Sequence, residues 1–302
     1  MVKDKKNRIR KAVIPVAGKG TRFLPATKQI PKEMLPIINR PMIDYAVEEA
    51  IESGIEQIIF VTSSGKYQIE DYFDRNLELE NFLAEHGKTD YMGLIRDIGS
   101  KVDIFTVRQK EQLGLGHAIS CAGPFIDDGE NFAIILADDL VLGKTPVTKQ
   151  LIDVSESLDG APTLGVMEVA KENVSKYGII KGEYLSETSA TLRMTAMVEK
   201  PSPSSAPSNL ASPGRYILPS DIFECLDQIP RGAGGEYQLT DAIKMLCEKT
   251  PTYAHIFSGR RYDTGSIAGY LEATIDFALE NEKTRALMQG LIKKSYEKLF
   301  SK

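Results

Sequence analysis

The sequence has few cysteines and no apolar run long enough to cross a membrane. Its three cysteines, Cys121, Cys225 and Cys247, are widely spaced, without a CxxC pair or a Cys/His cluster at zinc-ligand spacing. The longest apolar stretch, residues 132–137, is far shorter than the roughly 18 to 20 residues that a membrane span needs. The basic segment KDKKNRIRK near the start is not followed by the apolar run of a signal peptide. We therefore expect reduced thiols, no membrane association and a cytoplasmic location.

An excess of basic residues is also missing. There are 37 Lys and Arg residues against 42 Asp and Glu residues, which gives a net charge of −5 and argues against a dedicated nucleic-acid-binding protein. With 42% hydrophobic and 26% charged residues, the composition is that of a globular protein, and disorder of the whole chain is excluded. A chain of 302 residues can bury a large core without disulfides or metals. The mild acidity still allows a local basic pocket for a small phosphorylated ligand.

Strand-like and helix-like segments alternate along the first half of the chain. Strands are predicted at 12–17, 58–62, 102–107 and 132–136, and helices at 41–52, 67–73, 77–85 and from 116 to 121. Continuous apolar strands that alternate with helices indicate a mainly parallel α/β sheet that is covered on both faces.

The second half is less regular. It has strand signals at 163–169, 177–181, 192–199 and 215–218, and helix signals at 220–226, 238–248, 267–280 and 283–299. Because no clear linker separates the halves, we expect one continuous α/β domain with an extension, and some strands that run antiparallel.

Two closely spaced glycines follow the first predicted strand, in the segment Ala17-Gly18-Lys19-Gly20-Thr21-Arg22. Glycines allow positive φ and a close approach of the backbone to a ligand, so that several N–H groups can turn toward an anion. Arg22 adds a planar fork for phosphate oxygens, and Lys32 a second positive charge. The segment does not fit the GxxxxGK[ST] frame of a P-loop. It is also a poor dinucleotide fingerprint, since Phe23 occupies the third glycine position.

These residues open a series of blocks that resembles a known family. The blocks are GKGTRFLPATKQIPKEMLP (18–36), VRQKEQLGLGHAISCA (107–122), ILADDL (135–140), YGII (177–180), VEKPSP (198–203), GRYIL (214–218), GGEYQLTDAI (234–243) and YDTGS (262–266). In this order, they resemble the sugar nucleotidyltransferases and, within them, the bacterial UTP–glucose-1-phosphate uridylyltransferases. The resemblance covers about residues 8 to 279.

The resemblance implies a fold and a reaction. The fold is a Rossmann-like three-layer α/β/α nucleotidyltransferase domain over 1–302, with a mixed, mainly parallel sheet. It has a nucleotide-binding half at about 8–145, a sugar-phosphate-binding half at about 146–265 and C-terminal helices at about 266–302. UTP and α-D-glucose 1-phosphate would react with Mg²⁺ to give UDP-glucose and pyrophosphate, in a homo-oligomer that is a dimer or a tetramer. No covalent enzyme intermediate is implied, so that catalysis rests on positioning and charge stabilisation.

The resemblance also places the nucleotide-binding residues. Arg22 and Lys32, both catalytic, would hold the β- and γ-phosphates. Gln109 and Gly114 match the positions that read the base, and the Gln109 amide can offer a donor and an acceptor to the imide edge of uracil. The other expected nucleotide-binding residues are Ala17, Gly18, Gly20, Thr21 and Glu33. His117 is read as a neutral residue that packs under the loop, and no chemistry is assigned to it.

Carboxylates for a metal lie in two of the blocks. Asp138 follows a predicted buried strand, at the edge of an open α/β sheet where ligands gather. By the resemblance, Asp138 and Asp263 hold Mg²⁺, an ion that prefers hard oxygen ligands and usually binds one or two carboxylates, phosphates and water. For Asp139 we favour a capping or supporting role.

The sugar side is expected in the later blocks. Lys200 would bind the sugar 1-phosphate as a point charge and is the third catalytic residue, while Glu199 would accept hydrogen bonds from glucose hydroxyls. Gly178 would let backbone amides reach a sugar hydroxyl. Gly214, Arg215 and Glu236 are expected to line the pocket, with Arg215 either a phosphate ligand or a structural ion-pair residue.

Departures from the family pattern leave alternatives open. Lys19 stands where Leu is common, and Ala137 where Pro or Gly is usual. Ser212-Pro213 replaces an aliphatic pair, which puts the identity of the hexose in question. The alternatives are the same chemistry with dTTP or another hexose 1-phosphate, a catalytically weak regulatory homologue, and, more distantly, an NAD-dependent oxidoreductase.

Overall fold

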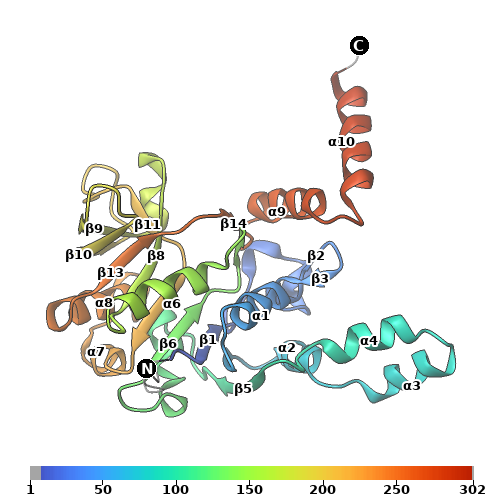
Figure 1. Cartoon of the computed structure of the whole chain (residues 1–302), viewed down its shortest axis with the longest axis horizontal. Coiled ribbons are helices and arrows are strands. Elements are labelled where there is room, and N and C mark those ends of the chain that lie inside the picture. Colours follow the sequence, from blue (N-terminus) through green and yellow to red (C-terminus); the bar gives the residue numbers. More distant parts are fainter. Residues whose placement is uncertain (1–7, 301–302) are drawn as a thin grey trace.

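A ten-stranded mixed sheet forms the centre of the molecule in a computed structural model that describes residues 8–300 (Figure 1). Its strand order is β11-β9-β10-β13-β8-β12-β6-β1-β4-β5. The strands are β1 (Lys11–Pro15), β4 (Gln57–Thr62), β5 (Asp103–Arg108), β6 (Asn131–Ile135), β8 (Thr163–Glu168), β9 (Gly178–Tyr184), β10 (Thr191–Glu199), β11 (Leu210–Ser212), β12 (Arg215–Pro219) and β13 (Tyr253–Ile256). The four strands of the first half are parallel, and β12 runs antiparallel between β6 and β8.

Helices cover both faces of this sheet and make the expected three layers. The helices are α1 (Met42–Glu52), α2 (Tyr67–Phe73), α3 (Leu77–Glu85), α4 (Thr89–Asp97), α5 (Leu115–Ser120), α6 (Val147–Ser157), α7 (Ile222–Gln228), α8 (Leu239–Lys249), α9 (Ile267–Glu280) and α10 (Arg285–Phe300). One buried cluster joins α5, α7 and α8 to the sheet, and a second joins α1, α2 and α6 to its other face. Because side chains alternate along a strand, Val13 enters the first cluster and Ile14 the second.

Smaller elements carry the chain around the edge of the sheet. Strand β7 (Asp139–Leu142) pairs with β14 (Arg260–Asp263), and β2 (Pro36–Ile37) pairs with β3 (Arg40–Pro41). The pair α3–α4 and the helix α10 extend away from the layered body (Figure 1). Among residues 8–300, no helix has both the length and the apolar content to cross a membrane.

The sequence patterns locate most of these elements and miss several. The predicted helices 67–73, 77–85 and 267–280 have the observed bounds, whereas α4, α6 and the short strands β7, β11, β13 and β14 were not predicted. Strand β5 was expected to be covered on both faces, but it lies at the edge of the sheet and Phe105 is 40% exposed. An edge strand has a neighbour on one side only, which its apolar sequence does not reveal.

A buried ion pair joins α1 to the centre of the sheet. Arg215, on β12, is 2% exposed and donates from Nε and Nη2 to the two carboxylate oxygens of Glu49, at 2.9 and 2.7 Å. The backbone carbonyls of Leu136 and Asp139 accept from Nη1 and Nη2 at 2.9 and 2.6 Å. Burial would raise the pKa of Glu49, but Arg215 outweighs that effect and lowers the pKa below its ordinary value. One guanidinium group therefore fixes the turn between β6 and β7.

We expect Glu49→Gln to lower the free energy of unfolding by about 3–5 kcal/mol, because Arg215 would remain buried without its counter-charge. Glu52→Gln, an exposed change on the same helix, serves as the control and should cost less than about 0.5 kcal/mol. Since the pKa of Glu49 is lowered by folding, its contribution is present above its ordinary pKa of 4.5 and is lost as the pH falls below it. Urea unfolding at several pH values measures both effects, and equal losses for the two variants would contradict this account.

Candidate functional site

Two adjoining cavities lie beside the ends of β1, β5 and β6. The first, of about 400 Å³, is lined by Gly18, Lys32, Glu33, Gln109 and Gly114, among others. The second, of about 730 Å³, contains the following predicted residues: Arg22, Asp138, Gly178, Glu199, Lys200, Glu236 and Asp263. Leu115, Leu136 and Glu236 line both cavities, so the two are neighbours. The structure thus brings the cations Arg22, Lys32 and Lys200 to adjoining spaces.

The glycine loop after β1 lets Lys32 approach closely. Gly20 has φ +65°, and a Cβ there would lie 3.1 Å from Cβ of Lys32 and 3.3 Å from a methyl group of Thr27. A side chain at this position would therefore be strained and crowded. Gly18 and Lys19 both line the first cavity, so Lys19 faces the same space as Lys32.

Asp138 and Asp263 lie together, although they come from distant parts of the chain. Antiparallel pairing of β7 with β14 sets Asp139 opposite Asp263, and Thr264 donates from its backbone N to the Asp138 carbonyl at 2.9 Å. A Cβ built on Gly265 would lie 2.7 Å from Oδ2 of Asp138 and 3.2 Å from Oδ1 of Asp263. The two carboxylates therefore converge on one point, where glycine leaves room.

This pair of carboxylates fits a divalent cation that also takes phosphate and water ligands. Among residues 8–300 no group of three or more His, Cys, Asp or Glu side chains could hold a metal by itself. Magnesium is commonly bound by one or two carboxylates together with substrate phosphates, which matches two acidic side chains in an open cavity.

Lys32 and Asp138 form an ion pair between the cavities. The Nζ atom of Lys32 lies 2.5 Å from Oδ2 of Asp138. Burial would raise the pKa of Asp138, but Lys32 outweighs it and holds the pKa below its ordinary value. Burial likewise works against the charge of Lys32, but Asp138 and Glu33 raise its pKa above the ordinary value. Both groups are therefore charged at neutral pH, and the ammonium group of Lys32 is the counter-charge of the Asp138 carboxylate.

A second, fully buried pair lies beneath Lys32. Glu33 is 1% exposed, and its Oε2 accepts from Nζ of Lys66 at 2.8 Å. Lys66 directly precedes α2, at the end of the loop that follows β4. Glu33, one of the expected nucleotide-binding residues, lines the smaller cavity, and its pair with Lys66 anchors the backbone next to Lys32.

Of the residues expected on the sugar side, Glu199 is the last residue of β10 and Lys200 directly follows it. The Oε2 atom of Glu199 accepts from the Thr240 hydroxyl at 2.6 Å, and its Oε1 lies 3.2 Å from Nζ of Lys200. Lys200 has φ +43°, an uncommon conformation for a residue with a side chain, and its backbone N donates to Tyr177 at 3.0 Å. At Gly178 a Cβ would lie 2.7 Å from the terminal methyl of Met197 and 3.4 Å from Oε2 of Glu199. These residues form one wall of the larger cavity.

Gln109 and Gly114 meet in the smaller cavity. The amide nitrogen of Gln109 donates to the Gly114 carbonyl at 3.1 Å and lies 3.0 Å from Nδ1 of His117. Gly114 has φ +100°, and a Cβ there would lie 2.7 Å from Cβ of Glu236 and 2.9 Å from the Tyr237 carbonyl. Only glycine fits this position without displacing the segment that joins both cavities.

Some predicted residues do not line either cavity. Arg215 holds Glu49, as described above, which is the structural ion-pair role of the two roles expected for it. Gly214 packs so closely that a Cβ would lie 2.6 Å from the side chain of Leu136. The remaining residues in this group are the loop residues Ala17, Gly20 and Thr21. The carbonyl of Ala17 accepts hydrogen bonds from the side chains of Gln112, at 2.8 Å, and Ser63, at 3.2 Å, and so connects the glycine loop to both residues.

The sequence reasoning passed over several residues around the cavities. Gln112 lines the smaller one, and Lys66 supports it from below. Arg261, in the larger one, pairs with the buried carboxylate of Asp139 and donates to the Tyr177 hydroxyl at 2.8 Å. Asp139 therefore has the supporting role that was favoured for it. The position of Lys66 after a parallel strand was the one signal available, since such loops meet at the carboxyl edge of the sheet.

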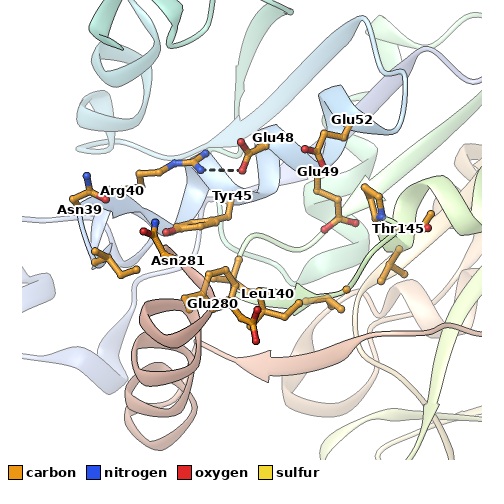
Figure 2. A pocket seen from close by; sticks show the side chains of 17 residues that line it. Asn39, Arg40, Tyr45, Glu48, Glu49, Glu52, Leu140, Thr145, Glu280 and Asn281 are labelled. Atoms are coloured by element: carbon orange, nitrogen blue, oxygen red, sulfur yellow. Dashed lines mark hydrogen bonds and ion pairs between the residues drawn. The ribbon is translucent and has the colours of Figure 1, made fainter. Parts of the chain in front are cut away.

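A third cavity lies apart from these two. It measures about 340 Å³ and is lined by residues of α1, β7 and α9. Figure 2 shows its acidic side chains, Glu48, Glu49, Glu52 and Glu280, with Arg40 paired to Glu48 at 2.9 Å. None of the predicted site residues lines it. Its link to them is Glu49, which lines this cavity and forms the ion pair with Arg215.

Known proteins resemble the chain along almost its whole length. The sequence profile of the family described as nucleotidyl transferase matches residues 11–280. A UTP–glucose-1-phosphate uridylyltransferase of Bacillus subtilis is 47% identical over 298 residues, which are 97% of this chain and 99% of that protein. A UTP–glucose-1-phosphate uridylyltransferase 2 of Staphylococcus saprophyticus is 49% identical over 287 residues, or 95% of this chain and 98% of that one.

Solved structures give the same picture. A UTP-bound UGPase from Acinetobacter baumannii superposes with a TM-score of 0.87 at 43% identity, and the match covers 94% of this chain and 98% of that chain. A UDP-glucose pyrophosphorylase complexed with UDP-glucose has a TM-score of 0.81 at 44% identity, with 90% and 100% covered.

We expect Gly114→Ala to lower the free energy of unfolding by about 2–4 kcal/mol, because it adds a clash to the cost of a positive φ. Gly129→Ala is the matched control, since Gly129 has φ +74° and a Cβ there meets nothing within 4 Å. That change should cost only about 1–2 kcal/mol, the price of the conformation alone. Urea unfolding measures the free energy of unfolding of both variants. If Gly114→Ala loses no more than Gly129→Ala, the segment with Glu236 and Tyr237 moves aside to accommodate a side chain, which would contradict this account.

Proposed function

The chain belongs to the nucleotidyl transferase family, and we propose that its two adjoining cavities carry out the reaction for which its relatives are named. UTP and glucose 1-phosphate react to give UDP-glucose and pyrophosphate. The observation that carries this proposal is the shared wall of Leu115, Leu136 and Glu236, with cations on each side of it and carboxylates between them. Such an arrangement suits two polyanions that must meet.

The reaction is a displacement at phosphorus. An oxygen of the sugar phosphate attacks the α-phosphorus of UTP, the bond from that phosphorus to the bridging oxygen breaks, and pyrophosphate leaves with this oxygen. The protein contributes position and charge stabilisation, because little covalent chemistry falls to its side chains. Both reactants are anionic, so their repulsion has to be offset before attack is possible.

On the nucleotide side, Lys32 and Arg22 hold the β- and γ-phosphates and stabilise the departing pyrophosphate. Arg22 lies close to the acidic pair, because its Nη1 donates to the Gly265 carbonyl at 3.4 Å. Lys32 exchanges its contact with Asp138 for phosphate oxygens when UTP binds. The Glu33–Lys66 pair keeps the backbone beside Lys32 in place during this exchange.

On the sugar side, Lys200 binds the phosphate group and Glu199 accepts from glucose hydroxyls. The Thr240 hydroxyl already orients one oxygen of Glu199, which limits the directions open to the other. Ser212 and Pro213 line the same cavity, so the departure noted in the sequence lies where the hexose would bind. Gln109 contacts the uracil ring in the smaller cavity.

Asp138 and Asp263 would hold Mg²⁺, for which their converging oxygens are suited. Bound there, the ion would supply positive charge to the reacting phosphates. Lys32 already places one positive charge next to Oδ2 of Asp138.

Oligomer formation and location complete the proposal. We propose a homo-oligomer, a dimer or tetramer, because α9 and α10 expose large apolar side chains. These are Ile267, Leu271, Ile275, Leu287, Leu291, Ile292, Tyr296, Leu299 and Phe300. We also propose a cytoplasmic location, in keeping with three free cysteines.

Pyrophosphate release tests the reaction directly. The assay compares UTP, CTP, dTTP, ATP and GTP, each with and without glucose 1-phosphate and with galactose 1-phosphate in its place. Release that requires both UTP and glucose 1-phosphate supports the proposal. Binding of UDP-glucose without turnover would instead support a regulatory homologue, and equal rates with dTTP or galactose 1-phosphate would support a broader specificity.

We expect Asp138→Asn to reduce turnover by about 100-fold or more, the scale of losing one electrostatic stabiliser. The amide cannot replace the negative charge that attracts both Lys32 and a metal. Steady-state rates over a range of Mg²⁺ concentrations measure the loss. Asp128→Asn, an exposed change away from the cavities, is the control and should keep the native rate. An unchanged rate in Asp138→Asn at saturating Mg²⁺ would remove this residue from the site.

Lys200→Ala should raise the KM for glucose 1-phosphate by at least about tenfold and change the KM for UTP by less than about twofold, because Lys200 contacts only the sugar phosphate. Lys181→Ala, an exposed lysine of β9 outside the cavity, should leave both values unchanged. Initial rates with each substrate varied in turn give the two constants. Equal increases for both substrates would contradict the assignment.

A further inference from the structure

Gln109 lines the smaller cavity, and two contacts determine how it presents its amide. Its backbone N donates to the Thr62 carbonyl at 2.8 Å, and the residue is only 5% exposed. The side chain lines the cavity in which the proposed function places the base, and the inference below rests on that function. An amide has a donor end and an acceptor end, so its orientation decides which base edge it matches.

The Gly114 carbonyl identifies this orientation, which two acceptors together hold in place. Carbonyl oxygens only accept hydrogen bonds, and the one at Gly114 lies 3.1 Å from the amide nitrogen of Gln109. Turning the amide over would set two oxygens against each other at that distance. The nitrogen therefore belongs on this side, and its second hydrogen faces Nδ1 of His117 at 3.0 Å.

The same argument fixes the tautomer of His117. Because the Gln109 nitrogen can only donate, Nδ1 of His117 must accept and the ring proton resides on Nε2. His117 is held for this role on α5, where the Cys121 backbone N donates to its carbonyl at 3.2 Å. The ring lies 6.4 Å from that of Tyr237, on the segment that also limits Gly114.

We propose that His117 is a positioning residue for base selection. With both hydrogens of the Gln109 amide engaged by Gly114 and His117, the oxygen Oε1 is the end presented to a ligand, and no hydrogen bond to it occurs within residues 8–300. The N3–H group of uracil donates to such an oxygen. Cytosine has a lone pair at N3, which the oxygen repels, so the contact between Gln109 and His117 selects UTP over CTP.

Two variants separate positioning from packing. His117→Leu keeps a side chain of similar size but removes one of the two acceptors of the Gln109 amide nitrogen, so that the Gly114 carbonyl alone opposes a turn of the amide toward cytosine. His117→Asn supplies an oxygen that can accept in place of Nδ1. His117 is not among the residues that line either cavity, so both changes act through Gln109.

The first measurement is the ratio of the dissociation constants for CTP and UTP, obtained by calorimetry, which needs no turnover. We expect the preference for UTP to fall about tenfold in His117→Leu, the scale of one hydrogen bond, and to stay within about threefold of native in His117→Asn. The KM for glucose 1-phosphate should change less than twofold in both. An unchanged ratio in His117→Leu, or an equal fall in both variants, would overturn the proposal.

The second measurement is the tautomer itself in the free protein. The chain has three histidines, so long-range ¹H–¹⁵N spectra are simple, and His117→Asn assigns the signal by its loss. A proton on Nε2 with Nδ1 bare is the expected result, and a proton on Nδ1 would refute the arrangement. Absence of pyrophosphate release from the native protein would count against the proposed reaction, whereas the tautomer and the affinity ratio decide the role of His117.

Discussion

The guanidinium group of Arg215 ties together the elements that surround the cleft. It is held by Glu49 of α1 and donates to carbonyls on either side of Asp138, those of Leu136 and Asp139. Thr148 of α6 donates to the same carboxylate at 2.6 Å, so that two helices and two strands depend on one buried charge pair. Removing one partner of a buried ion pair lowers the stability of the fold because the other charge stays buried without compensation. A single substitution of Arg215 or Glu49 is therefore more destabilising than replacement of both. The turn that carries Asp138 therefore has a fixed place relative to the sheet.

Charge balance extends from that turn into the cleft. Lys32 neutralises Asp138, Lys66 neutralises Glu33, and Arg261 neutralises Asp139. Each pair joins a residue at one edge of the sheet to a residue from another loop or strand. The Lys32–Asp138 pair is the most exposed of the three, with the side chain of Asp138 28% exposed. The proposed exchange of Lys32 from Asp138 to phosphate concerns this pair.

Sequence patterns located the parts of the fold that carry a strong local signal. The apolar strands β1, β4 and β6 and the helix α9 agree with the predicted segments, because continuous apolar runs and helical periodicity depend only on neighbouring residues. Short strands such as β7 and β14 carry no such signal, and their pairing depends on contacts between residues far apart in the chain. The same limit applies to the site. Arg22, Lys32, Asp138, Lys200 and Asp263 were found through the blocks they belong to, whereas the burial of Arg215 and the contact of His117 with Gln109 follow from tertiary packing alone.

The ribbon of β7 and β14 has a consequence for the order in which the cleft is built. Thr264 donates to the Asp138 carbonyl from its hydroxyl at 2.8 Å, across a separation of 126 residues. Asp263 therefore takes its place only after the intervening chain has been synthesised and has folded against the sheet. A nascent chain that ends before β14 already carries the glycine loop and Lys32 but holds only half of the acidic pair. Synthesis of β14 thus completes the acidic pair at the cleft.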